Sequence, residues 1–171
     1  MKAAYINETG DPEVIQVGDV SEPELAPGEL LIRVHAVAVN PIDTYIRSGV
    51  VAFDLPQPFI IGCDAAGVVE AVGEGAHRFS VGDRVWCTNQ GLLGRQGTFA
   101  ERIAVAENWC FALPDEVSYE DAAACALVAV TAHLGLYREA MLEAGETLLV
   151  IGGSGGVGSM VVQMAKTTGA R

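Results

Sequence analysis

The sequence predicts a mixed α/β chain, with a β-rich first part, then helices, and finally a short strand followed by a helix. Three observations predict this class. Short runs rich in β-branched residues, separated by glycine and proline turns, extend as far as Val105. From Ser118 the chain becomes rich in alanine. Near the C-terminus an apolar run leads into a glycine-rich loop and then into apolar residues at helical spacing.

Length, charge and cysteine content restrict the class of protein further. The chain has 171 residues, 50% of them hydrophobic, which is enough for one domain or for one domain and part of another. No apolar run reaches membrane-spanning length and the start lacks a signal peptide, so we expect a soluble cytoplasmic protein with no membrane partner. A net charge of -12 argues against a nucleic-acid partner, because contacts with phosphates need a basic surface. The four cysteines form no C-x-x-C pair and are predicted to be reduced and buried.

The first part contains six strand candidates separated by turn residues. Their spacing favours a small barrel or a partly open sheet. The candidates are residues 2–7, 14–20, 30–39, 66–72, 83–87 and 98–105.

The alanine-rich part is predicted to be helical. Ser118 and Asp121 have the spacing of a capping box, S-x-x-D, which opens a helix. A second helical stretch is predicted from about Ala129 to Ala140, and residues 147–151 form an apolar run typical of a strand buried in a parallel sheet. We place a domain boundary within the helices near residue 124, which gives domains 1–124 and 125–171.

The glycine-rich loop carries the strongest local signal. Gly153, Gly155 and Gly158 match G-x-G-x-x-G between a predicted strand and a predicted helix. Glycines let backbone N–H groups approach a pyrophosphate without obstruction by a Cβ atom, and a helix N-terminus adds free donors and partial positive charge. The loop therefore predicts a dinucleotide site formed by Gly153, Ser154, Gly155, Gly156, Val157 and Gly158. The alternative is a glycine-rich turn with no ligand, and Ser154 either donates its hydroxyl or merely tolerates the turn.

The residue that distinguishes the two nicotinamide cofactors is expected about 20 residues beyond such a loop. The sequence stops at Arg171, before that position. A parallel sheet with one strand and one helix is not a stable unit, so we expect the sequence to be an N-terminal fragment.

Residues 39–49, VNPIDTYIRSG, resemble the signature of quinone oxidoreductases of the zeta-crystallin type, in the medium-chain dehydrogenase/reductase superfamily. Further segments resemble the family in the same order: IIGCDAAGVV at residues 60–69, VGDRV at 81–85 and GTFAE at 97–101. The resemblance extends over essentially the whole chain. It implies a GroES-like, β-rich catalytic domain at 1–124 and the start of a Rossmann domain at 125–171, with the active site in the cleft between them.

The resemblance also implies roles for three side chains. Asn40 and Tyr45 would line the substrate side of the nicotinamide, and Thr131 would contact the nicotinamide end of the cofactor. Tyr45 offers a hydroxyl donor and a flat ring. Each has a plainer alternative: Asn40 sets a turn before a proline, Thr131 bonds its own helix backbone, and Tyr45 is ordinary packing.

Other polar side chains are predicted to be structural. Asp43 either serves catalysis or favours a helix dipole, and Arg47 is equally well a solvated charge. His35, His77 and His133 have neither metal-site nor catalytic-triad spacing, which favours structural histidines.

The same superfamily includes zinc alcohol dehydrogenases, whose catalytic ligands are two cysteines and a histidine. By resemblance these three positions hold Asn40, Cys63 and Leu127, and a single thiol cannot assemble such a site. The four-cysteine lobe for structural zinc is also absent, since residues 87–101 contain one cysteine. We predict a zinc-free protein in which Cys63 is a small core residue.

The predicted function is therefore NADPH-dependent reduction of a quinone, by transfer of hydride or electrons without metal. NADPH is inferred from the resemblance alone, and the fragment by itself is expected to be inactive. One alternative is a reductase of α,β-unsaturated aldehydes or ketones, and another is a non-catalytic truncated domain. We expect a homo-oligomer when the protein is full length, because the family associates through its Rossmann domain.

Overall fold

The computed structural model describes all of residues 1–171 and divides into two compact units, Met1–Ala124 and Cys125–Arg171. Each unit is described separately. No helix in the structure is both long and apolar enough to cross a bilayer.

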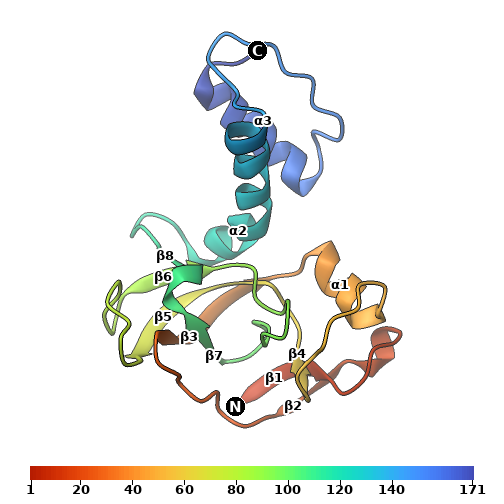
Figure 1. The fold of residues 1–171 in the computed structure, drawn as a ribbon, viewed down its shortest axis with the longest axis vertical. Helices are drawn as coiled ribbons and strands as arrows, with labels where there is room; N and C mark the ends of the chain where they lie inside the picture. Colours follow the sequence, from red (N-terminus) through yellow and green to blue (C-terminus); the bar gives the residue numbers. More distant parts are fainter. The chain divides into compact units, whose positions relative to one another are not determined.

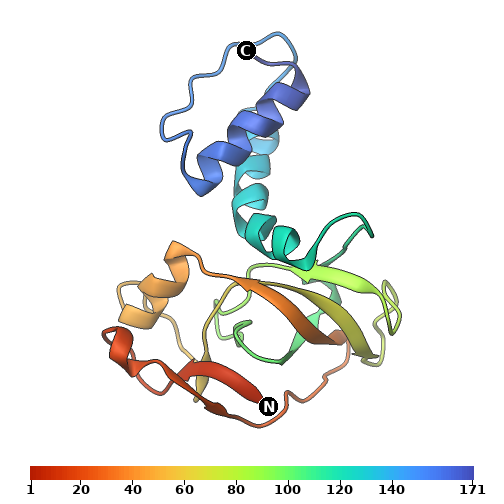
Figure 2. The ribbon, with the colours of Figure 1, turned by 180° about the vertical axis from the view of Figure 1, so that it is seen from behind.

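The first unit contains two antiparallel sheets (Figure 1). The smaller sheet has the strand order β2 (Gln16–Asp19), β1 (Lys2–Ile6) and β4 (Phe59–Ile60). The larger has the order β7 (Arg102–Ala106), β3 (Glu29–Ala38), β5 (Asp64–Val72), β6 (Arg84–Cys87) and β8 (Cys110–Ala112). Figure 2 shows β3 (orange) and β5 (olive) side by side, as their long register requires.

The sheets do not close into a hydrogen-bonded barrel. A single isolated bridge, Ala3 to Ala100, joins the smaller sheet to the segment before β7. The strand spacing favoured a small barrel or a partly open sheet, and the structure has the partly open arrangement. The sequence missed β4 and β8, because strands of two and three residues are too short to show an alternating pattern. Pro12–Val14 forms a 3-10 turn where the second strand was expected to begin.

The core of the first unit follows from the alternation of side chains along its strands. Leu30 and Ile32 of β3 are buried against Val69 of β5 and Val85 of β6. A second cluster joins Ile46 of α1 (Pro41–Ser48) to Ile6 of β1 and Phe59 of β4 in the smaller sheet. Helix α1 begins at a proline, whose fixed φ suits a first turn, and ends at Gly49 with φ 79°.

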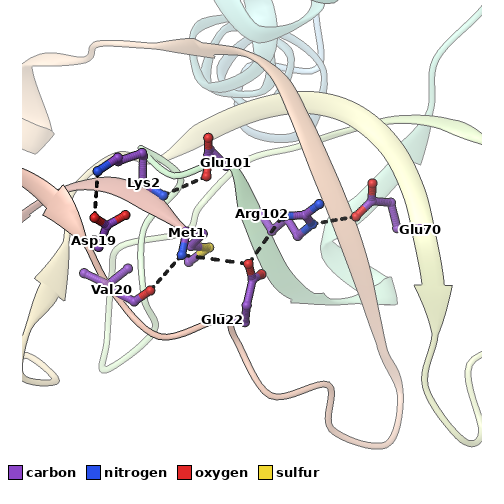
Figure 3. A network of polar contacts seen from close by, with 8 residues as sticks. All are labelled: Met1, Lys2, Asp19, Val20, Glu22, Glu70, Glu101 and Arg102. Atoms are coloured by element: carbon purple, nitrogen blue, oxygen red, sulfur yellow. Dashed lines mark hydrogen bonds and ion pairs between the residues drawn. The ribbon is translucent and has the colours of Figure 1, made fainter.

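A polar network ties the ends of four segments together (Figure 3). Arg102 of β7 bonds Glu70 of β5 at 2.8 Å and contacts Glu22 at 3.3 Å. The Met1 ammonium donates to the Val20 carbonyl at 2.9 Å and lies 3.8 Å from Glu22. Arg102 lowers the pKa of Glu70. These charges compensate one another. Arg102 therefore links β7 to β5 across β3, and Glu22 links Arg102 to the start of the chain before β1.

Helix α2 (Tyr119–His133) begins as the sequence predicted, because the Ser118 Oγ accepts the Asp121 N–H at 3.0 Å. The two predicted helical stretches are one, since α2 continues into a π-helical segment, Leu134–Glu139. In the second unit, Val128 lies near Gly156 at the start of α3 (Gly156–Thr168). The Tyr137 hydroxyl bonds Thr168 Oγ1 at 2.7 Å, which joins the two helices further along.

The prediction of a buried strand at residues 147–151 is wrong. Leu149 is 85% exposed and Ile151 is 92% exposed, and no strand is formed. A fully apolar strand is buried only where it has neighbouring strands on both sides. Among residues 1–171, only Arg171 lies beside the segment 147–151. The Leu148 N–H donates to Arg171 at 2.7 Å, and the Arg171 N–H donates to Glu146 at 2.8 Å, which is the pattern of a parallel bridge.

Candidate functional site

Asn40 lies where the chain leaves β3 and enters α1. The register pairs Ala38 with Asp64, so Asn40 follows two residues after the sheet contact. Its side chain is 5% exposed, and its Nδ2 donates to the Asp64 carboxylate at 2.9 Å. Asn40 is therefore more than a turn residue, because its carboxamide is bound within the first unit.

Asp43 lies in the first turn of α1 and reaches back to the residue that precedes the helix. Its Oδ2 accepts the Asn40 N–H at 2.7 Å, and the Asn40 side chain faces the Asp43 N–H in return, which together make a capping box. The side chain is 3% exposed, and its Oδ1 is buried without a partner. Burial raises the pKa of Asp43, against the lowering effect of the Asn40 N–H, and the nearby Asp64 charge adds to the rise. Its role in holding the helix start fits the plainer expectation for this residue.

Asp64 and Thr88 were not among the candidates from the sequence, and the register explains why they meet. Ala65 of β5 pairs with Cys87 of β6. Because these strands are antiparallel, Thr88, which follows Cys87, lies beside Asp64, which precedes Ala65. The Thr88 hydroxyl donates to Asp64 Oδ1 at 2.5 Å, while Asn40 binds Oδ2. One signal could have revealed Asp64: a single carboxyl inside the apolar run IIGCDAAGVV must be buried, and buried carboxylates need donors.

Close backbone packing fixes the start of β5 next to this cluster. Gly62 has φ 108°, and a Cβ atom there would lie 2.3 Å from the Phe99 ring. A Cβ atom on Gly97 would lie 2.4 Å from the Ile60 carbonyl oxygen. The resulting contact lets the Thr98 hydroxyl donate to the Asp64 carbonyl at 2.9 Å. Asp64 is thus held through both its backbone and its side chain.

Cys63 precedes Asp64 and is fully buried. Burial raises the pKa of its thiol strongly, and the neighbouring Asp43 charge raises it further. The thiol therefore stays protonated, which suits a small core residue and not a nucleophile.

Tyr45 and Arg47 lie in the second half of α1, and neither is buried. Tyr45 is 49% exposed and its hydroxyl has no hydrogen bond, so it is not an ordinary core residue. Arg47 donates to the Gly10 carbonyl, and the Gly10 N–H donates to the Arg47 carbonyl at 2.9 Å. Arg47 therefore ties α1 to the turn at Gly10 and is not a free solvated charge.

The glycine loop of the second unit leads directly into α3. The first N–H groups of this helix, on Gly156, Val157 and Gly158, have no acceptor, and no acidic side chain lies in its first turn. Gly152 has φ 80°, and a Cβ atom on Gly158 would lie 2.1 Å from the Gly152 carbonyl oxygen. The loop therefore presents free donors and the positive end of a helix dipole, with few side chains over them, and these features fit an anion such as a pyrophosphate.

Ser154 and Thr131 are both in the second unit. The Ser154 hydroxyl makes no hydrogen bond within the chain, so it is available to a ligand. The Thr131 hydroxyl donates to the Leu127 carbonyl at 2.8 Å, which is the plainer alternative for this residue. Its oxygen can still accept a hydrogen bond.

The histidines have structural surroundings. His35 stacks on Tyr119 with ring centroids 4.4 Å apart, and His133 meets Tyr137 edge-on at 4.9 Å. The His77 N–H donates to Glu107 at 2.9 Å. No group of three or more His, Cys, Asp or Glu side chains comes together in a way that suits a metal ion.

The prediction that all four cysteines are buried is wrong for one of them. Cys63, Cys87 and Cys110 are buried and Cys125 is partly exposed, and all four are free thiols. Cys125 lies on α2, whose alanine-rich sequence gives no apolar face by which its burial could be predicted.

A cavity lies elsewhere in the first unit. Its volume is about 780 Å³, and it is bordered by the segment after β2, the edge of β7 and residues 94–97. Neither Asn40 nor Tyr45 lines it. The predicted site residues of the first unit are therefore on a different part of its surface.

Comparisons with known proteins identify the family of the chain. A family model described as "Alcohol dehydrogenase GroES-like domain" matches residues 26–115. The chain is 39% identical over 170 residues to a quinone oxidoreductase of Rattus norvegicus, covering 99% of this chain and 50% of the relative. It is 37% identical over 172 residues to a 2-methylene-furan-3-one reductase of Solanum lycopersicum, covering 97% of this chain and 44% of the relative.

A solved structure of an Escherichia coli quinone oxidoreductase complexed with NADPH matches with a TM-score of 0.90 at 30% identity. The match covers 100% of this chain and 51% of that one. The chain thus spans about half the length of the curated relatives it matches. The GroES-like, β-rich fold class that the sequence predicted is confirmed.

Proposed function

We propose that this chain, which belongs to the alcohol dehydrogenase GroES-like family of the medium-chain dehydrogenase/reductase superfamily, forms part of an NADPH-dependent quinone reductase. The observation that carries the proposal is the start of α3. Three consecutive N–H groups have no acceptor there, and the residues around them have little or no side chain. The similarity to quinone oxidoreductases, one of them complexed with NADPH, supports both the cofactor and the substrate class.

NADPH supplies a hydride equivalent when it is bound. The loop at Gly153, Ser154, Gly155, Gly156, Val157 and Gly158 binds the pyrophosphate through its backbone N–H groups. Thr131 accepts a hydrogen bond at the nicotinamide end through its hydroxyl oxygen. Asn40 and Tyr45 orient the substrate.

The Tyr45 hydroxyl donates a hydrogen bond to the quinone oxygen on which negative charge develops. This role needs a donor that is not already committed within the protein. Tyr45 meets that requirement, since its hydroxyl has no partner and half of the side chain is exposed. Its flat ring also matches a flat acceptor.

The reaction proceeds without zinc. Asn40 and Leu127 offer no thiolate or imidazole at two of the ligand positions, and the Cys63 thiol alone cannot form a three-ligand site. A quinone delocalises the developing charge and needs little Lewis-acid help. We also propose a cytoplasmic homo-oligomer for the full-length protein, without a nucleic-acid partner.

A second candidate substrate class has support of its own. The relative from Solanum lycopersicum is named for a methylene-substituted furanone, which is an α,β-unsaturated ketone. Reduction of that class needs hydride at a β-carbon and a proton donor. The second candidate function is therefore enone reduction by the same site.

A substrate panel tests both candidates. The full-length protein is assayed by NADPH oxidation with a set of quinones and, separately, with enones of similar size, and each assay is repeated with NADH. We expect quinones to give kcat/KM at least about tenfold above the enones, and NADPH to be preferred. The reverse order would favour enone reduction, and no turnover with either class would contradict the proposed function.

A further inference from the structure

We propose that Asp64 is a positioning residue for the reaction: its buried carboxylate holds the carboxamide of Asn40 in one of its two possible orientations. This inference rests on the role of Asn40 in the proposed function. Asp64 does not itself contact the substrate and acts through Asn40.

The backbone brings three polar side chains from three segments to one point. Asp64 opens β5, opposite the end of β3, and Asn40 follows β3 by two residues. Thr88 follows β6, whose register with β5 sets it beside the same carboxylate. Sheet register alone therefore assembles the group. The Asn40 Nδ2 donates to Asp64 Oδ2 at 2.9 Å, and the Thr88 hydroxyl donates to Asp64 Oδ1 at 2.5 Å.

A carboxylate that accepts hydrogen bonds on both oxygens can orient an amide. The two ends of an asparagine side chain differ chemically, since Nδ2 only donates and Oδ1 only accepts. Facing Asp64, only Nδ2 can bond, so Oδ1 points away from the carboxylate. Thr88 prevents the carboxylate from turning, because its hydroxyl holds the other oxygen.

Burial makes this orientation strict. Asp64 is fully buried and Asn40 nearly so, and hydrogen bonds are stronger where water does not compete for the partners. A flipped Asn40 would set its carbonyl oxygen against the carboxylate and leave both acceptors without donors. The capping box also turns the Asn40 side chain toward the Asp43 N–H, so loss of Asp64 removes one of the two contacts that set the orientation of the carboxamide.

A double-mutant cycle tests the proposal in the full-length enzyme. Asp64→Asn has nearly the same shape but can satisfy either orientation of Asn40. We expect it to lower kcat/KM for the quinone about tenfold, mainly in kcat, and to have less than about a twofold effect when Asn40→Ala is already present, because coupled residues are not additive. Asp83→Asn is the matched control, since it makes the same change on an exposed side chain just before β6, and it should leave the kinetics unchanged.

A spectroscopic measurement tests the contact without any turnover. In the 1H–15N spectrum of the wild type, one Asn40 Nδ2 proton should exchange slowly with solvent. Asp64→Asn should remove this protection and Asp83→Asn should retain it. If the protein reduces no quinone but the proton is protected, the proposed function fails and the contact stands.

Two outcomes would overturn the proposal. One is an equal loss of kcat/KM from Asp64→Asn with and without Asn40, which would make Asp64 a purely structural residue. The other is unchanged kinetics in Asn40→Ala. If Asp64→Asn does not fold, Thr88→Val replaces it: we expect a two- to fivefold loss that disappears in the Asn40→Ala background, and an undiminished loss there contradicts positioning.

Discussion

Two buried carboxylates near the start of α1 have different hydrogen-bonding surroundings. Asp64 accepts side-chain hydrogen bonds on both oxygens. Asp43 accepts the Asn40 N–H on one oxygen, and its other oxygen has no partner within hydrogen-bond distance, although the nearby Cys63 thiol lowers the pKa of Asp43 in part. A carboxylate that lacks donors is costly to ionise inside a protein, and here the neighbouring Asp64 charge adds to that cost. Asp43 is therefore a residue whose ionised form works against the fold.

The stability of the chain should show this effect as a dependence on pH. Folding raises the pKa of Asp43, so in the pH window above its ordinary pKa the folded chain retains a proton that the unfolded chain has lost. The contribution of Asp43 to stability therefore falls as the pH rises through that window. Asp43→Asn cannot ionise and keeps an oxygen for the Asn40 N–H. We expect its melting temperature to exceed that of the wild type by a few degrees at neutral pH, and the difference to vanish in acid.

Asp83 offers a matched control for this experiment. Its Oδ2 accepts the Ser80 N–H at 2.8 Å, the same local contact as that of Asp43, but on the surface. Asp83→Asn should give no gain in melting temperature at neutral pH. A melting temperature of Asp43→Asn below that of the wild type at neutral pH would show that the ionised carboxylate is stabilising after all.

Tyr45 is the site residue that can be changed with the least effect on the fold. Since its hydroxyl has no partner and the side chain is half exposed, Tyr45→Phe should leave the melting temperature unchanged. If the hydroxyl donates to the quinone, Tyr45→Phe should lower kcat about two- to fivefold, and Tyr45→Ala should also raise KM about tenfold through loss of the ring. Steady-state kinetics with separately measured NADPH affinity checks this. Unchanged quinone kinetics in both variants would remove Tyr45 from the site.

At the scale of elements, the glycines of the loop before α3 have different reasons for being glycine. At Gly158 the protein itself leaves no room, because a Cβ atom would lie 2.1 Å from the Gly152 carbonyl oxygen. At Gly155 the nearest atom would lie 3.4 Å from the added Cβ atom, which a side chain tolerates. The chain's own packing therefore requires glycine at Gly158, while at Gly155 the requirement would come from a ligand.

Alanine substitutions separate these two reasons. Gly155→Ala should keep the fold of the second unit and weaken NADPH binding at least about tenfold in the full-length protein, since the pyrophosphate must approach the backbone closely. Gly158→Ala should lower both the affinity and the melting temperature. Gly135→Ala is the control, because an added Cβ atom there meets nothing within 4 Å. Full NADPH affinity in Gly155→Ala, measured by titration, would show that the loop does not bind the cofactor.

For the whole molecule, the proposed chemistry has a consequence for metal dependence. Prolonged chelation of the full-length enzyme should leave its turnover with quinone unchanged, because the residues at the expected zinc positions cannot form a three-ligand site. Elemental analysis provides the second measurement. Stoichiometric zinc that is lost together with activity would contradict the proposal.

The sequence predicted most elements but missed those that depend on partners distant along the chain. The Ser118 cap and the long strand at β3 were predictable, because capping residues and β-branched runs act locally. Residues 147–151 have the composition of a buried strand, yet Ile151 is exposed, because burial of an apolar run depends on neighbouring strands. Local pattern predicts what a segment prefers, and tertiary contacts decide whether that preference is met.

The same division applies to the site. The sequence by itself determined the glycine loop, which follows from a motif of adjacent residues, and the candidates Asn40, Tyr45 and Thr131, which follow from the family resemblance. Only the tertiary structure showed that Asp64 and Thr88 hold Asn40, because sheet register joins residues that lie 24 positions apart in the chain. It also decided that the Thr131 hydroxyl bonds its own helix and that Asp43 is buried. Hydrogen-bond partners and desolvation are properties of the packed chain, and a linear motif does not contain them.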